Sequence, residues 1–457
     1  MENKKLNGLH EGCKLTIIGA GVSGRALASL AVRLGFSVFV TDKAEINPKT
    51  KEIIKRYGIE YEERGHTEKA LEADALVLSS GISPRAPIIE GALKRGIPVV
   101  GELDFVFPHL KSKVIGVTGT NGKTTTTSLI AHLLTNGGFE AEAVGNIGNA
   151  LADYAFSDHE WLVVEVSSFQ LYWSQYASFD ISVITNIAPD HLDWHGSYEE
   201  YFASKTKIFN LTSDNGIGIC QARDVEEIKK QLNRPLKIIP FVDNKNKVVD
   251  WPEGIYFEDG QCVLRDDSKI RLFDVSNVHL IGTHNLENAA MSAVVAYYSG
   301  LDPQVIEEGI DSFKALPHRC EEVANKNGIR YVNDSKGTNV SSTVAALNSI
   351  EGKKIIILGG KGKGEDYGPL AEAVKEHTEA AILMGEEKIK IAEALSRKGY
   401  TNFHLANSME EAVEKAVSLA SPGCTVLLSP ACTSWDMYEN YKARGEHFRK
   451  VVNELTD

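Results

Sequence analysis

The sequence predicts an α/β protein of three domains, and three observations support this prediction. Short apolar segments of strand length alternate with amphipathic helical segments along most of the chain, which is typical of parallel α/β domains. The chain has 457 residues, more than a single hydrophobic core usually serves. Glycine-rich turns follow strands in three separate blocks that show no fixed repeat period. We therefore expect domains at residues 1–102, 103–315 and 316–457.

The first block begins with a predicted strand at Lys14–Gly19, a glycine-rich turn and a helix that continues to Leu34. Further short apolar strands are predicted at Val38–Asp42, Ala75–Leu78 and Ile97–Val100. Apolar runs of this length between turn residues are typical of strands that are buried in a parallel sheet. The block therefore predicts one small α/β domain.

The second block repeats this pattern with a strand at Val114–Val117, a glycine-rich loop and a helix over about Lys123–Thr135. Its other predicted elements are strands at Trp161–Val166 and Ile181–Ile187, a hairpin-like β insertion at about Gly254–Val275 and a closing helix at Asn285–Tyr298. The third block begins near Leu316, and its strands are predicted at Arg330–Asn333, Lys354–Leu358, Ala380–Met384 and Thr425–Leu428. Helical segments separate these strands, so this block also predicts an α/β domain.

The composition limits where the protein acts and what it binds. Acidic residues outnumber basic ones by 62 to 49, and the formal net charge is −13. General attraction to nucleic acid or to anionic membranes is therefore not expected. The six cysteines form no Cys-x-x-Cys pair, which favours buried thiols in a reducing compartment. We expect a cytoplasmic protein without membrane insertion, because no apolar run has the length of a bilayer span or the character of a signal peptide.

The first glycine-rich turn, Gly19–Gly24, reads Gly-Ala-Gly-Val-Ser-Gly, and Asp42 ends the next strand. Such glycines permit a tight turn and allow backbone amides at a helix N-terminus to approach a phosphate. NAD binding is the first interpretation of this fingerprint. Another nucleotide, or a tight turn without a ligand, agrees with the same residues. The turn alone does not choose between these alternatives.

The second glycine-rich loop carries a stronger signal. Residues Thr118–Thr125 read Thr-Gly-Thr-Asn-Gly-Lys-Thr-Thr and lie between an apolar strand and a predicted helix. The loop amides can surround phosphates, Lys123 supplies a compact cation and the Thr124 hydroxyl can bind Mg²⁺. The spacing differs from the standard Walker motif, because Val117 stands where the first glycine is expected and Gly116 lies one residue outside. Strand, loop, Lys-Thr pair and helix occur in the correct order and predict ATP binding.

Polar side chains at two strand ends of the second block are candidate metal ligands. Glu165 lies within an apolar strand, where a carboxylate is costly unless it is paired or bound to a metal. Asp190 and His191 follow the next strand, at the edge where open α/β sheets bind ligands. A structural histidine explains His191 alone equally well. We therefore predict that Glu165 binds Mg²⁺ and keep both interpretations of His191.

Three loops of the third block have the composition of a binding site. Asp334 ends a strand and is suited to accept hydrogen bonds from sugar hydroxyls. The loop Gly359–Gly364 combines glycines with lysines and can bind a carboxylate or phosphate, although a charged surface turn has the same composition. The segment Ser429–Asp436 follows the last long strand as a further candidate binding loop. Its Cys432 is not expected to be a nucleophile, because the sequence implies no histidine partner.

Together these motifs resemble the Mur ligase family of peptidoglycan synthesis along essentially the whole chain, and Thr118–Thr125 matches the family's ATP signature. Four further stretches resemble the branch that adds D-glutamate to UDP-N-acetylmuramoyl-L-alanine, namely Gly145–Gly148, Glu165–Leu171, Asn333–Asn339 and Ser429–Cys432. The resemblance implies an N-terminal Rossmann-like domain for the UDP part, a central P-loop domain for ATP and a C-terminal Rossmann-like domain for the amino acid. It replaces the NAD interpretation of the first turn.

The resemblance also implies roles for individual residues. Catalytic roles fall to Lys123, Glu165, His191 and Lys205, and ATP contacts to Gly119, Thr120, Asn121, Gly122, Lys123, Thr124, Thr125, Asn288, Arg319 and Asp334. The UDP substrate would contact Gly21, Ser23, Gly24, Asp42, Lys43, Ser79 and Asn146, and D-glutamate would contact Thr338, Lys363, Ser434 and Tyr441. Thr124 and Glu165 would hold one Mg²⁺, with Asn146 and His191 at a second metal site, and Mn²⁺ could replace the metal. Lys205, which from its helix alone would be an ordinary surface lysine, would be carbamylated by CO₂ and would then bind or orient a metal.

The implied reaction converts a carboxylate into an acyl phosphate with ATP, and the amine of the amino acid then displaces phosphate. A carboxylate needs this activation because oxide is a poor leaving group. His191 or a nearby carboxylate could deprotonate the amine, and the sequence does not choose between them. We expect a monomer that acts on small molecules. The nearest alternative is a family member of other amino-acid specificity. An NAD-dependent oxidoreductase or a non-catalytic nucleotide-binding module would leave several of these motifs unexplained.

Overall fold

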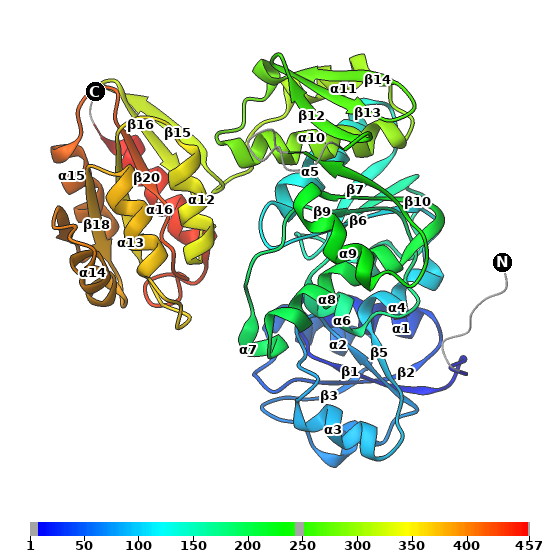
Figure 1. Ribbon diagram of the computed structural model, residues 1–457. Helices are drawn as coiled ribbons and strands as arrows, with labels where there is room; N and C mark the ends of the chain where they lie inside the picture. The colour runs from blue at the N-terminus through cyan, green and yellow to red at the C-terminus, as the bar shows by residue number, and fades with distance from the viewer. Residues whose placement is uncertain (1–7, 243–250, 456–457) are drawn as a thin grey trace. The chain divides into compact units, whose positions relative to one another are not determined.

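The protein is an α/β protein with three separate sheets, which confirms the fold class predicted from the sequence (Figure 1). The computed structural model describes residues 8–242 and 251–455. All six cysteines lie in these ranges as free thiols, and five of them are buried as expected. Cys13 differs from that expectation and is only partly buried, because it lies in the turn that precedes the first strand.

The N-terminal sheet is parallel and has the order β3-β2-β1-β4-β5. Its strands are β1 (Lys14–Ile18), β2 (Ser37–Thr41), β3 (Glu60–Glu62), β4 (Ala75–Leu78) and β5 (Val99–Gly101), with helices α1 (Val22–Arg33), α2 (Pro48–Arg56) and α3 (Pro87–Lys94). The side chain of Asn47 accepts from the Thr50 amide and Pro48 follows it, so α2 begins at a standard cap. The strand β3 was not predicted, because the polar sequence Glu-Tyr-Glu of this edge strand carries no apolar pattern.

The central sheet has the order β14-β13-β12-β11-β10-β9-β6-β8-β7. Its strands are β6 (Lys113–Thr118), β7 (Ala141–Gly145), β8 (Trp161–Glu165), β9 (Phe179–Ile184), β10 (Thr212–Gln221), β11 (Lys237–Phe241), β12 (Gly254–Glu258), β13 (Gln261–Arg265) and β14 (Lys269–Asp274). The helices of this region are α5 (Lys123–Asn136), α6 (Ser168–Trp173), α7 (Leu192–His195), α8 (Tyr198–Asn210), α9 (Val225–Gln231), α10 (Thr283–Tyr298) and α11 (Pro303–Ser312). The strands from β7 to β12 pair in parallel, whereas β12, β13 and β14 pair antiparallel. The predicted hairpin insertion is therefore confirmed, and it extends the edge of the main sheet.

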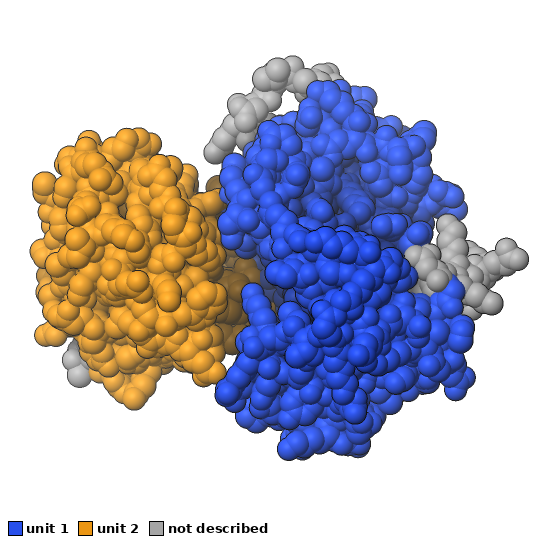
Figure 2. Space-filling view, turned by 90° about the horizontal axis from the view of Figure 1, so that it is seen from below, with its two compact units in different colours: residues 1–277, 288–311 blue, residues 278–287, 312–457 orange. Residues whose placement is uncertain are grey.

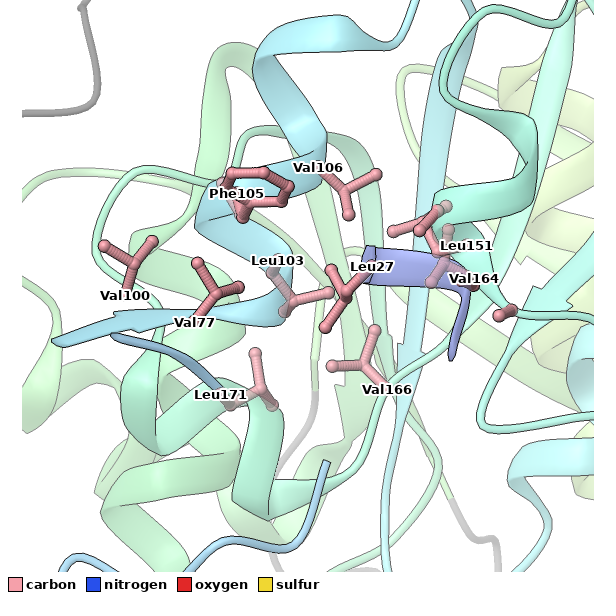
Figure 3. Packing of buried hydrophobic residues seen from close by; sticks show 14 of the residues in the cluster. Leu27, Val77, Val100, Leu103, Phe105, Val106, Leu151, Val164, Val166 and Leu171 are labelled. Atoms are coloured by element: carbon pink, nitrogen blue, oxygen red, sulfur yellow. The ribbon is translucent and has the colours of Figure 1, made fainter. Parts of the chain in front are cut away.

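The N-terminal and central sheets share one hydrophobic core. The short helix α4 (Glu102–Val106) contributes Leu103 and Phe105, both fully buried. Figure 3 shows Leu103 and Leu27 of α1 among residues of the central region that include Val166 and Leu171. Because one cluster draws on both sheets, residues 1–277 and 288–311 form a single compact unit.

Two carboxylates of α4 hold both ends of α6. The buried Glu102 side chain accepts a hydrogen bond from the amide of Gln170 at 3.0 Å, and Gln170 forms a capping box with Ser167 at the start of the helix. At the other end, the carboxylate of Asp104 accepts from the Ser174 hydroxyl at 2.7 Å and from the next three backbone amides. A helix of six residues is marginal by itself. These contacts therefore hold α6 in place directly after the end of β8.

The third sheet has the order β15-β16-β20-β17-β18-β19 and is parallel except for β15. Its strands are β15 (Glu321–Lys326), β16 (Ile329–Asn333), β17 (Lys354–Gly359), β18 (Ala380–Met384), β19 (Phe403–Leu405) and β20 (Thr425–Leu428). Its helices are α12 (Val340–Ser349), α13 (Gly368–His377), α14 (Lys388–Arg397), α15 (Met409–Leu419) and α16 (Tyr441–Glu454). The sheet belongs to a second compact unit of residues 278–287 and 312–457 (Figure 2).

The expected domain boundaries fall at different kinds of position. The boundary after residue 102 lies within α4, whereas the boundary after residue 315 lies in the segment between α11 and β15. The chain separates into two compact units, the first of which contains two sheets. The division into three domains stays a prediction.

Candidate active site

The segment predicted to bind ATP, Thr118–Thr125 (the ATP loop), connects β6 to the start of α5. Its conformation requires glycine at two positions, because the φ angles of Gly119 and Gly122 are +146° and +82°. A Cβ atom at Gly122 would also lie 2.5 Å from Oδ1 of Asn288. The close approach brings Asn288 against the loop, as expected for a residue assigned to the same ligand.

Two residues that follow β9 hold this loop in place. The backbone amide of Thr120 donates to the carbonyl oxygen of Asn186 at 2.8 Å, and the amide of Asn121 donates to Asn186 Oδ1 at 3.0 Å. The hydroxyl of Thr185 donates to the carbonyl oxygen of Asn121 at 2.6 Å. Lys123 lies over the loop, with Nζ 2.8 Å from the carbonyl oxygens of Gly119 and Thr120. These contacts fix the conformation of the loop.

Oxygen-bearing side chains gather beside the loop at the ends of β8 and β7. The Glu165 carboxylate, only 3% exposed, accepts from the Thr124 hydroxyl at 2.6 Å. The side-chain amide of Asn146 donates to the other carboxylate oxygen at 3.2 Å. The structure therefore brings together three residues predicted to lie around the metal.

Lys205 of α8 belongs to the same cluster and is a buried residue rather than an ordinary surface lysine. Its side chain is 2% exposed, and Nζ donates to the carbonyl oxygen of Gly119 at 2.7 Å. Burial lowers the pKa of Lys205 well below its usual value, the charge of Lys123 lowers it further, and Asp190 and Glu165 oppose the shift. The lowered pKa favours the neutral amine, which is the form that reacts with CO₂.

His191 lies at the rim of this region. Its backbone is left-handed, with φ of +52°, and its side chain is 42% exposed. The ring makes an edge-to-face contact with Phe169, with centroids 4.9 Å apart, and Nε2 lies 3.6 Å from a carboxylate oxygen of Asp190. A non-glycine residue in this conformation is uncommon and is often found at functional sites. The geometry leaves both interpretations of His191 open.

Six of the seven residues predicted to bind UDP lie at the carboxyl edge of the N-terminal sheet, whereas Asn146 follows β7 of the central sheet and contacts Glu165. Gly21 caps α1, Ser23 and Gly24 lie in its first turn, Asp42 and Lys43 follow β2, and Ser79 follows β4. The Asp42 carboxylate accepts from the backbone amides of Ala20 at 2.6 Å and Ala44 at 2.8 Å. It therefore stabilises the glycine-rich turn itself.

The remaining predicted residues lie in the second compact unit, around the carboxyl ends of β16, β17 and β20. Asp334 is buried and accepts from the Ser429 hydroxyl at 2.7 Å. Burial raises the pKa of Asp334 to about 6, whereas Ser429 and the charge of Arg319 lower it. Three neighbouring non-glycine residues have left-handed backbones, at positions 318, 320 and 431. Strain of this kind concentrates at binding sites.

The four residues predicted to bind D-glutamate occupy loops and a helix start in the same unit. Thr338 follows β16, Lys363 is exposed on the glycine-rich loop after β17, and Ser434 is buried on the loop after β20. Tyr441 is the first residue of α16, and the Lys336 ammonium lies 4.1 Å from the centroid of its ring.

Comparison with known proteins identifies the family. Residues 117–296 match the Mur ligase middle domain, residues 318–432 the Mur ligase, glutamate ligase domain, and residues 14–88 the MurD N-terminal domain. The chain belongs to the Mur ligase family. A Mur ligase of Christiangramia forsetii named UDP-N-acetylmuramoylalanine--D-glutamate ligase is 38% identical over 450 residues, covering 97% of this chain and 100% of that protein. A Bacteroides fragilis protein of the same name is 38% identical over 449 residues, with the same coverage.

Solved structures of other Mur ligases have the same fold. UDP-N-acetylmuramate-alanine ligase from Thermotoga maritima matches with a TM-score of 0.60 at 18% identity, covering 96% of this chain and 99% of that one. MurF ligase from Thermotoga maritima in complex with ADP matches with a TM-score of 0.59 at 17% identity, covering 98% and 96%. As a Mur ligase, this protein is an ATP-dependent enzyme that forms carbon–nitrogen bonds. None of its described helices is long and apolar enough to cross a membrane.

The donor set of this Mur ligase fits Mg²⁺ bound together with a nucleotide. Thr124, Glu165 and Asn146 offer a hydroxyl, a carboxylate and an amide oxygen, the hard donors that Mg²⁺ prefers. Among residues 8–242 and 251–455, no group of three or more His, Cys, Asp or Glu side chains is placed to hold a metal. Mg²⁺ commonly takes one or two carboxylates and completes its coordination with phosphate oxygens and water.

The sequence indicated no role for three residues that hold segments next to predicted site residues. Asn186 holds the ATP loop, Glu102 holds α6, and the buried Arg444 connects two loops of the second unit. Asn186 could have been noticed in the sequence, because its side-chain amide directly follows the strand β9. The contacts of Glu102 and Arg444 join segments distant in sequence, so spacing could not identify them.

Proposed function

We propose that the protein joins D-glutamate to UDP-N-acetylmuramoyl-L-alanine with consumption of ATP, through an acyl-phosphate intermediate, in the synthesis of peptidoglycan precursors. The observation that carries the proposal is the full-length similarity to ligases of that name, at 38% identity, together with the match to the MurD N-terminal domain. The buried cluster around Lys123 and Glu165 supports it with the groups that phosphoryl transfer needs.

Charge neutralisation by the cluster explains how two anions can react. The carboxylate of the UDP-linked substrate attacks the γ-phosphorus of ATP, and ADP leaves. Backbone amides at the start of α5 and the Lys123 ammonium would bind the β- and γ-phosphates and stabilise the charge that develops. Thr124 and Glu165 would hold one Mg²⁺, with Asn146 and His191 near a second. The ion supplies further charge neutralisation when bound.

The amine of D-glutamate then attacks the acyl carbon, and the tetrahedral intermediate collapses to an amide and phosphate. His191 or a neighbouring carboxylate such as Asp190 would accept the proton of the amine. Asp334, Arg319 and Asn288 would contact ATP. Thr338, Lys363, Ser434 and Tyr441 would contact D-glutamate, and the loops after β1, β2 and β4 would bind the UDP part.

We also propose a cytoplasmic monomer with three functional domains, and light scattering of the purified protein tests the oligomeric state.

A phosphate-release assay tests the proposal with UDP-N-acetylmuramoyl-L-alanine, ATP, Mg²⁺ and a panel of amino acids. Release should require all three substrates and the metal, with D-glutamate preferred over L-glutamate, L-alanine and diaminopimelate. Equal turnover with another amino acid would assign a different specificity within the family. Phosphate release that is independent of the amino acid would argue against the ligase reaction.

A further inference from the structure

The side chain of Arg444, on the first turn of α16, is a buried cation without a carboxylate partner. It is 2% exposed, and burial lowers the pKa of Arg444 to about 10. No carboxylate of the described residues lies within ion-pair distance of its guanidinium, although Asp436 and Asp334 act on it from farther away. Burying a charge in this way is costly. Because a buried charge with only neutral hydrogen-bond partners does not favour folding, the presence of arginine at this position is better explained by a role in function.

The four hydrogen bonds of Arg444 connect two loops. Nε donates to the Ser335 hydroxyl at 3.0 Å, and one terminal nitrogen donates to the Ser335 carbonyl oxygen at 2.8 Å. The other terminal nitrogen donates to the carbonyl oxygens of Cys432 at 3.1 Å and Thr433 at 3.2 Å. The planar guanidinium thus bridges the loop after β16 and the loop after β20, and these two strands are neighbours in the sheet.

Both loops lead directly to residues proposed to bind the amino acid. Thr433 precedes Ser434, and Ser335 lies three residues before Thr338. The Ser335 hydroxyl also donates to the carbonyl oxygen of Tyr441 at 2.9 Å, which connects a third such residue to the same group.

We propose that Arg444 is a positioning residue for the amino-acid pocket, because it holds these two loops at the separation that the amino acid requires. The inference rests on the proposed function. Arg444 itself need not touch the substrate. Its removal should therefore weaken amino-acid binding selectively, since the ends of β1, β2 and β4, where UDP is proposed to bind, belong to the other compact unit.

Two variants test the proposal by steady-state kinetics with each substrate varied in turn. Arg444→Lys keeps the charge but loses the planar fork, and Ser335→Ala removes one acceptor with little change in volume. Each should raise KM for D-glutamate by about tenfold, while KM for the UDP-linked substrate changes by less than about twofold. Arg449→Lys on the same helix is the matched control, because Arg449 is partly exposed and pairs with Glu321 at 2.6 Å. This control should leave both KM values unchanged.

Thermal melting establishes whether each variant is folded. If Arg444→Lys does not fold, Ser335→Ala still tests the proposal. An unchanged KM for D-glutamate in the folded variants would overturn the proposal, as would a parallel rise of both KM values. Absence of D-glutamate-dependent phosphate release by the unaltered protein would instead overturn the proposed function.

Discussion

Lys123 and Lys205 donate hydrogen bonds to the same atom, the carbonyl oxygen of Gly119, at 2.8 and 2.7 Å. The two side chains come from α5 and α8, and the charge of Lys123 lowers the pKa of Lys205. A protonated Lys205 would be repelled by the Lys123 ammonium across this carbonyl group. Negative charge in this position, from phosphate groups or from a carbamate on Lys205, would relieve the repulsion.

Replacement of Lys123 by alanine should remove most activity without unfolding the protein. The ammonium group lies over the ATP loop, so its loss should cost stabilisation of the transition state rather than core packing. The measurement is kcat together with a thermal melting curve. Lys113→Ala is the control, because Lys113 is exposed at the opposite end of β6. A loss of less than about tenfold, or about 1.4 kcal/mol, would mean that the loop is not the phosphate site.

Lys205→Ala should be nearly inactive, and a short-chain carboxylic acid should partly restore activity. The acid would replace the carbamate that we expect on the buried amine. Lys207→Ala on the same helix is the control, because the Lys207 ammonium donates to the carbonyl oxygen of Tyr172 at 3.0 Å instead of the loop. A crystal structure with Mg²⁺ in which Lys205 carries a plain ammonium far from the metals would contradict the carbamate.

Glu165→Gln should raise the Mg²⁺ concentration needed for half-maximal activity by about tenfold or more. Glutamine can still accept the hydrogen bond from Thr124 but loses the negative charge that attracts the ion. A Mg²⁺ titration at saturating substrates measures the shift. Glu142→Gln on the neighbouring strand β7 is the control, and the Glu142 carboxylate accepts from Asn149 at 3.4 Å. The same Mg²⁺ dependence in both variants would remove Glu165 from the metal site.

Glu102→Gln should stabilise the protein more at high pH than at low pH. Burial raises the pKa of Glu102 above its ordinary value of 4.5, although Gln170 and Ser23 donate hydrogen bonds to it. The folded protein therefore retains a proton that the unfolded chain releases, and stability falls as the pH rises above about 4.5. Glutamine is neutral and removes this loss. The gain in Tm should be larger at about pH 8 than at about pH 5, and an equal gain at both would be inconsistent with a raised pKa.

Several elements were predicted from a local pattern, whereas β7, β10 and β11 of the central sheet were not predicted. The strands β4, β18 and β20 were predicted with the observed limits, because each is a short apolar run between turn residues. Short or polar edge strands such as β3 and β19 were not, since pairing with a neighbour rather than composition makes them strands.

The site divides in the same way. The residues of the ATP loop share one segment, and their motif predicted their role. Thr124 contacts Glu165, and Lys205 is buried, because of the order of the strands in the sheet. This order cannot be read from the spacing of residues along the chain. The residues themselves indicated that Thr124 and Glu165 bind Mg²⁺, and the resemblance to a family added Lys205 to them.

The hydrogen bonds from α4 to α6 limit how the chain can be shortened for expression or ligand screening. A fragment starting at residue 103 would keep Asp104 but lose Glu102, and the Gln170 amide would lose its buried acceptor. It would also expose the apolar surface that Leu27 and Val77 cover. Such a truncation should aggregate or bind nucleotide poorly even though every residue of the ATP loop is present. Shorter versions of the protein should therefore retain the N-terminal sheet and α4 with Glu102.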